Sequence, residues 1–126
     1  LTFIGQIPQI MFLLKDKMDS LIKFDKVIEP SLANSSLGPY YFFQYYIPSD
    51  FINEQYFLEA FKEDVQTAFI DLNIILKDNI PDRAYGELLD LSGRGSNQEY
   101  FHVFLDRFSK FNFSEYRLVI RLEVNE

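Results

Sequence analysis

The residues with the clearest chemical potential are Gly93, Arg94, Gly95 and Ser96, which stand between a short apolar run and a segment with helical spacing. If a helix begins after them, its free N–H groups and its dipole favour an anion, and Arg94 adds a charge-assisted contact. The alternative is structural: the glycines permit positive φ angles in a tight connection, while Ser96 and Glu99 form a capping box. Glu99 also places a negative charge where a phosphate would bind. We favour a structural turn and keep these four residues as a possible anion-binding site.

The remaining titratable residues predict no catalytic site. His102 is the only histidine and the chain has no cysteine, which disfavours a transition-metal site. On a helix, His102 would pair with Asp106 four residues on, as surface side chains commonly do. Glu63, Asp64 and Asp71 have no evident partner at the spacing of an acid–base pair. We therefore expect a protein that is not an enzyme and that uses no metal and no cofactor.

The most informative stretch is the aromatic run at 39–48, PYYFFQYYIP, which is typical of a β-strand. Alternation divides its side chains between two faces. One face carries Tyr41, Phe43, Tyr45 and Ile47, and the other carries Tyr40, Phe42, Gln44 and Tyr46. Burial of one phenylalanine or tyrosine side chain is worth about 1.5–3 kcal/mol, so a bare second face would favour association. The sequence therefore predicts that another surface covers it.

The strand predicted at 115–124 alternates in the same way, with arginines and a valine on one face. We combine the two strands into a predicted partner-binding surface. Its residues are Tyr40, Phe42, Tyr46, Arg117, Val119 and Arg121.

Several surfaces are candidates to cover this face. The N-terminal helix is the cheapest, through Leu14, Met18 and Leu21, because it is already tethered. A second copy, another protein or a stacked ligand are the alternatives. If the helix covers the face, we expect the contact on an edge strand such as 115–124, whose unpaired backbone groups can extend a sheet into another chain.

Periodicity predicts the elements that position these residues. Helices are expected at 9–28, 50–65 and 97–111, and strands at 39–48, 67–77, 83–92 and 115–124. The small residues at 31–38 indicate a linker. The stretch 66–77 is ambiguous, since a single helix over 52–77 also keeps its apolar residues on one face. Its alternation and β-branched content favour the strand.

This order, a helix followed by β-α-β-β-α-β, predicts an α+β fold of the ferredoxin-like split βαβ type. Both helices of that motif would pack on one face of an antiparallel sheet, with its first and third strands central. We expect a helical segment at 1–30 and the ferredoxin-like domain at 39–126, forming one compact domain overall. Because the chain begins at Leu1, we expect it to be an excerpt of a larger protein.

Charge narrows the classes of partner. With 12 basic and 19 acidic residues, the formal net charge is −7 at pH 7. Nucleic acids and anionic membranes repel such a chain unless a basic patch overrides the average. The most apolar stretch, LTFIGQIPQIMFLL, is shorter than the roughly 20 residues of a membrane span. We therefore disfavour nucleic-acid binding and expect no membrane span in this chain.

The function that fits these observations is a non-catalytic protein-interaction or assembly module, binding a protein partner or a second copy as a homodimer. The alternatives are a small-ligand or anion-sensing domain and an acidic inhibitor of the immunity type. A nucleic-acid-binding sheet is the least favoured, although its stacking aromatics and arginines are the residue types such a sheet uses. The sequence alone does not identify the partner or the ligand.

Overall fold

The computed structural model describes residues 6–24, 27–48, 54–107 and 115–124. They form two helices and six strands, which confirms the predicted α+β class. In chain order the elements are α1 (Gln9–Leu21), β1 (Val27–Ser35), β2 (Gly38–Pro48), α2 (Glu54–Ile70), β3 (Ile75–Asp78), the 3-10 turn η2 (Arg83–Tyr85), β4 (Glu87–Arg94), β5 (Tyr100–Arg107) and β6 (Glu115–Glu123).

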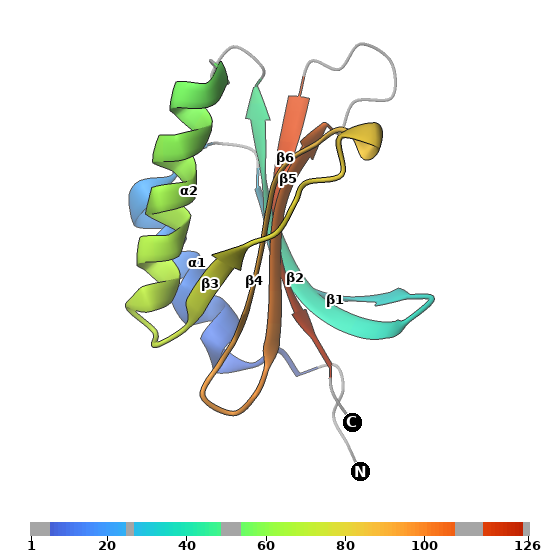
Figure 1. Cartoon of the computed structure of the whole chain (residues 1–126). Helices are drawn as coiled ribbons and strands as arrows, with labels where there is room; N and C mark the ends of the chain where they lie inside the picture. The colour runs from blue at the N-terminus through green and yellow to red at the C-terminus, as the bar shows by residue number, and fades with distance from the viewer. Residues whose placement is uncertain (1–5, 25–26, 49–53, 108–114, 125–126) are drawn as a thin grey trace.

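The strands form a single antiparallel sheet in the order β1-β2-β6-β5-β4-β3. From β3 to β6 the chain meanders, and β6 then closes the sheet against β2. Both helices lie on the same side of this sheet, and the hairpin end of β1 and β2 curves away from them (Figure 1). The sheet therefore has one helix-covered face and one helix-free face.

The core lies between the helices and the helix-covered face. Cross-strand neighbours align there, as Phe43 pairs with Ile120, and Ile120 pairs with Val103 on β5. The helices contribute side chains at helical spacing, so that each buries one stripe. These buried helical residues are Met11, Leu14 and Met18 of α1, and Phe61, Val65, Ala68 and Phe69 of α2.

The predicted helix at 97–111 is wrong for its described residues, because Tyr100–Arg107 is strand β5. The apolar residues of this segment fit both periods, but Phe101, Val103 and Leu105 are the ones fully buried. The preceding residues form a hairpin turn and no capping box. The Gly95 N–H donates to the Glu99 carbonyl at 2.9 Å.

The predicted helix at 9–28 is too long, and the predicted linker at 31–38 is wrong. Residues 27–35 form the edge strand β1, which pairs with the aromatic strand β2 and is irregular between Ile28 and Ser31. An edge strand tolerates proline and small residues, because only one side of it needs ladder hydrogen bonds. Hydrogen bonding to β2 makes this segment a strand, although its composition is typical of a loop.

The stretch 66–77 is neither a strand throughout nor a continuous helix. Helix α2 continues to Ile70, beyond the predicted end at 65, and only the short strand β3 follows. Asn73 adopts a left-handed conformation with φ of 64°. The Ile74 N–H returns to the Phe69 carbonyl at 3.0 Å, a helix-ending arrangement that asparagine tolerates well.

The strands predicted at 39–48, 83–92 and 115–124 are present as β2, β4 and β6, although β4 begins later than expected. The ferredoxin-like strand order is not found, because β1 was not predicted and the predicted helix at 97–111 contains strand β5. β6 lies between β2 and β5, so the prediction that 115–124 is an edge strand is wrong. Within the described residues, neither helix combines the length and the apolar character that crossing a membrane requires.

Candidate functional site

The helix-free face brings all six predicted partner-binding residues together. On β2 and β6, Phe42 pairs with Arg121, and Tyr46 pairs with Arg117. They surround a recess of about 340 Å³, which we call the aromatic hollow. It is lined by Ile28, Tyr40, Phe42, Gln44, Tyr46, Phe104, Arg117, Val119 and Arg121. The sequence placed Gln44 on this face but did not count it among the partner-binding residues. It missed Ile28 and Phe104, because β1 and β5 were not predicted as strands.

Helix α1 does not cover this face, so that prediction is wrong. Its buried residues Leu14 and Met18 belong to the core on the opposite side of the sheet, while Leu21 is exposed. The helix is held there by polar contacts to β2 as well. The Tyr45 hydroxyl donates to Asp19 Oδ1 at 2.6 Å. Since Tyr45 belongs to the helix-covered face, this contact places α1 away from the hollow.

Arginine–aromatic contacts characterise the helix-free face. The Arg121 guanidinium carbon lies 3.7 Å from the centre of the Tyr40 ring, and the Arg117 guanidinium carbon lies 5.8 Å from that of Phe104. Near the hairpin between β4 and β5, the Arg94 guanidinium carbon lies 5.0 Å from the centre of the Tyr100 ring. Guanidinium groups are attracted to aromatic faces, and such contacts hold both side chains in place.

The two arginines of the hollow are matched by carboxylates of the same sheet. Arg117 donates from Nε to Asp106 Oδ1 at 2.8 Å and from Nη2 to Oδ2 at 3.3 Å. Arg121 Nη2 lies 3.0 Å from Glu123 Oε1. The Arg121 Nε atom is buried and has no hydrogen-bond partner among the described residues. The hollow is therefore close to neutral, and one buried donor in it has no acceptor among the described residues.

The base of the hollow is well packed. Val119 and Gln44 face each other across β2 and β6 and are only 4% and 5% exposed. The rings of Tyr40 and Phe42 line the same recess, with centres 5.8 Å apart and inclined at 52°. The hollow thus has a buried floor on two interior strands of the sheet, which is the kind of support that a binding site needs.

His102 lies in a polar network outside the lining of the hollow. Its Nε2 is 2.8 Å from Asp90 Oδ1, and the same oxygen accepts from Asn79 Nδ2 at 2.9 Å. The predicted helical pair with Asp106 is wrong, because β5 is a strand and that carboxylate binds an arginine. The nearby Ser92 hydroxyl donates to Asn79 Oδ1 at 3.3 Å. These bonds form a structural network and do not align a serine with the imidazole as nucleophile and base.

The Gly93-Arg94-Gly95-Ser96 stretch ends β4 and enters a hairpin, so the helix on which the anion-binding prediction depended is absent. Neither glycine has a positive φ angle. They allow neighbouring atoms to lie close to the backbone. A Cβ atom at Gly93, for example, would lie 2.6 Å from the Ile75 carbonyl oxygen. The Arg94 Nη1 atom donates to the Gln98 carbonyl at 3.1 Å. Gly93, Arg94 and Gly95 thus have a structural explanation in the strand and its turn.

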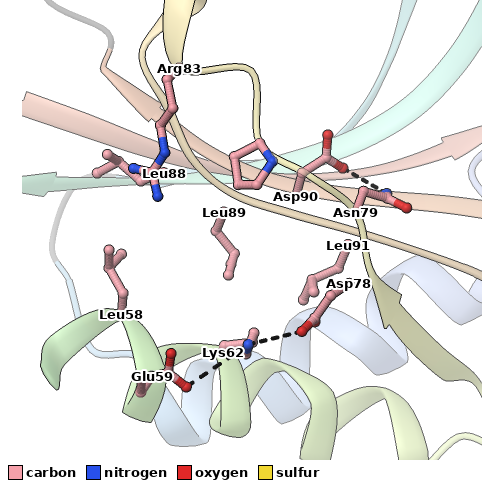
Figure 2. Close-up of a pocket in the computed structure, with 11 residues that line it drawn as sticks. Leu58, Glu59, Lys62, Asp78, Asn79, Arg83, Leu88, Leu89, Asp90 and Leu91 are labelled. Carbon is pink, nitrogen blue, oxygen red and sulfur yellow. Dashed lines mark hydrogen bonds and ion pairs between the residues drawn. The ribbon is translucent and has the colours of Figure 1, made fainter. Parts of the chain in front are cut away.

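A second recess of about 200 Å³, the helix–strand cleft, lies between α2 and the β3–β4 region. Figure 2 shows Leu58 of α2 and Leu89 of β4 pointing into it. Lys62 Nζ donates to Asp78 Oδ2 at 3.0 Å, and this hydrogen bond raises the pKa of Lys62 above its ordinary value of 10.5. The residues come from three separate segments, so no local sequence signal marked this cleft.

Comparison with protein-family models, with curated proteins and with solved structures found no match for this chain. Within the described ranges, no cluster of three or more histidine or acidic residues is placed to hold a metal ion. The geometry of the two recesses is therefore the basis for a functional proposal, and the aromatic hollow has the more distinctive chemistry.

Proposed function

We propose that this chain is a non-catalytic protein-interaction module whose helix-free face binds a partner protein through the aromatic hollow. The observation that carries the proposal is a recess lined by aromatic rings and arginines on a face that neither helix covers. Tyrosine and arginine are enriched among the residues that dominate binding energy in protein interfaces. Rings already held by arginine contacts lose little conformational entropy on binding, which favours such a role.

The edges of the sheet offer less to a partner. The edge strand β1 contains Pro30 and an irregular pairing register, and β3 is only four residues long and carries Lys77. Short strands, prolines and lysines are the features that discourage strand addition at an edge. A net charge of −7 on each copy also opposes self-association. These features favour the face over the edges and a different protein over a homodimer.

A small-ligand-sensing domain is the second candidate. The hollow volume of about 340 Å³ lies at the lower end of the range of roughly 300–1,000 Å³ found for small-molecule sites. Gln44 in the floor and the two arginines offer a few polar groups among apolar side chains, as such sites do. In this case the hollow would hold a free molecule and no partner protein.

Site-specific photocrosslinking tests the proposal. A photoreactive residue at Ala33, which pairs with Tyr40 at the rim of the hollow, is expected to capture one partner from an extract of the source cells. The matched control is the same residue at Ile75, an exposed position on β3 at the far edge of the sheet. The captured protein is then purified and its affinity measured for the wild type, Phe42→Ala and Ile75→Ala. Equal capture at both positions, or equal affinity of all three chains, would contradict the proposal.

A further inference from the structure

We infer that the aromatic hollow receives one large apolar side chain of the partner, aromatic or leucine-like, together with a neutral backbone carbonyl. This inference rests on the proposed function and names the chemistry of the group that binds. The anionic ligand that two arginines would ordinarily indicate is not what the geometry favours.

The first reason is charge. Asp106 binds Arg117 through both oxygens, and Glu123 binds Arg121, so each cation already has a carboxylate at hydrogen-bond distance. An incoming anion would have to displace one of these carboxylates or lie beside it. Two like charges at such a distance repel each other, and partial burial strengthens the repulsion. A neutral group avoids this cost.

The second reason is the lining. Ile28, Phe42, Phe104 and Val119 supply carbon surface, and the Tyr40 ring is stacked on a guanidinium. A volume of about 340 Å³ suits one large side chain and is too small for the packed face of a helix. Central, well-packed recesses that take a single aromatic or aliphatic anchor are typical of interface hot spots.

The third reason is the surplus donor capacity at Arg121. Its Nη2 atom faces Glu123, while Nε is buried without an acceptor among the described residues. Native structures satisfy nearly all buried polar groups, so a guanidinium with an unpaired donor has capacity for one more acceptor. The guanidinium has five donor hydrogens in a fixed plane, and a small rotation of it in the presence of a carbonyl oxygen pairs one more of them. A peptide segment brings that carbonyl with its side chain.

The test is an NMR titration of the isotope-labelled full chain with small probes. The neutral probes are N-acetyl-phenylalaninamide, N-acetyl-leucinamide and N-acetyl-glycinamide, and the anionic probes are benzoate and inorganic phosphate. We expect saturable shifts at Gln44, Phe104 and Val119 with the phenylalanine probe, weaker ones with the leucine probe and none with glycine. Binding should change by less than about twofold between low and high salt, because no net charge is neutralised.

Variants assign the shifts to the hollow. Phe42→Ala should weaken binding of the phenylalanine probe by about tenfold, as expected for loss of a central aromatic contact. Ile75→Ala removes an equally apolar, exposed side chain outside the hollow and should leave binding unchanged. Arg121→Lys keeps the charge but removes the planar donors, so it should weaken the amide probes and leave the fold intact, as judged by its NMR spectrum.

Three results would overturn the inference. Tighter binding of benzoate or phosphate, falling steeply with salt, would make the hollow an anion site. Absence of saturable shifts with every neutral probe would contradict the inference that the hollow binds an apolar side chain. The proposed function would still be supported if the photocrosslinking captured a partner near the hollow. Concentration-dependent shifts at the same residues without any probe would identify a second copy as the occupant.

Discussion

The two faces of β2 carry similar aromatic side chains but have different surroundings in the folded chain. Phe43 and Tyr45, on the helix-covered face, are 0% and 1% exposed, whereas Phe42 and Tyr46, on the helix-free face, are half-buried. The difference comes from the neighbours. Helices α1 and α2 cover the first face with apolar side chains, while arginines flank the rings of the second. Aromatic content therefore does not identify a core; the elements packed on it do.

The largest expected effect compares Phe43→Ala with Phe42→Ala, one substitution on each face. Phe43 is fully buried, so its loss should lower the free energy of unfolding by about 3–5 kcal/mol, the usual cost of a large core truncation. Phe42 is half-buried and should cost about 1–2 kcal/mol, because only part of its surface is removed from water. Urea unfolding of both variants measures the difference, and equal losses would abolish the contrast between the faces.

A smaller effect sharpens the picture of the helix-covered face, where Gly93 lies against Ile75 and Leu76. Gly93→Ala should lower the free energy of unfolding by about 1–3 kcal/mol, because the new methyl group meets a backbone oxygen at 2.6 Å. Gly95→Ala is the matched control. Its methyl group meets the end of the flexible Glu99 side chain, so we expect a cost below about 1 kcal/mol. Thermal or urea unfolding of both variants measures the two costs. A larger cost for Gly95→Ala than for Gly93→Ala would show that β3 shifts easily to accommodate a methyl group.

The smallest expected effect is the contribution of Tyr45 to the pH dependence of the free energy of unfolding. Burial, followed by the hydrogen bond to Asp19, raises the pKa of this phenol above its ordinary value of 10.0. Above that pH the unfolded chain loses a proton that the folded chain keeps. The contribution of Tyr45 is therefore complete below pH 10.0 and is lost as the pH rises further. Tyr45→Phe should lower the free energy of unfolding by about 1 kcal/mol near neutral pH and show a flatter alkaline decline.

The measurement is urea unfolding at a series of pH values on both sides of 10.0. Asp19→Asn is the informative companion, since it removes the acceptor charge but leaves the phenol buried. It should retain part of the alkaline decline. Identical slopes for wild type and Tyr45→Phe would mean that the phenol titrates alike in the folded and unfolded chains.

The candidate site was largely predictable from sequence because its two main strands have strict alternation. β2 and β6 each alternate over eight or more residues, so the side chains sharing a face follow from the period alone. That Phe42 and Arg121 would be direct neighbours was not predictable, because sequence carries no register between distant strands. Phe104 and Ile28 were missed for a different reason. Phe104 was assigned to the predicted helix at 97–111, and Ile28 to the end of the predicted helix at 9–28.

The sequence by itself determined the α+β class, the strands β2, β4 and β6, and the division of the aromatic run into two faces. These features depend on local periodicity, which short segments express without their neighbours. The tertiary structure alone decided that 100–107 is a strand, since Phe101, Phe104 and Leu105 also fit helical spacing, and pairing with β4 and β6 outweighs it. It also decided which face the helices cover. That choice depends on how the whole chain buries its apolar surface, and no single segment encodes it.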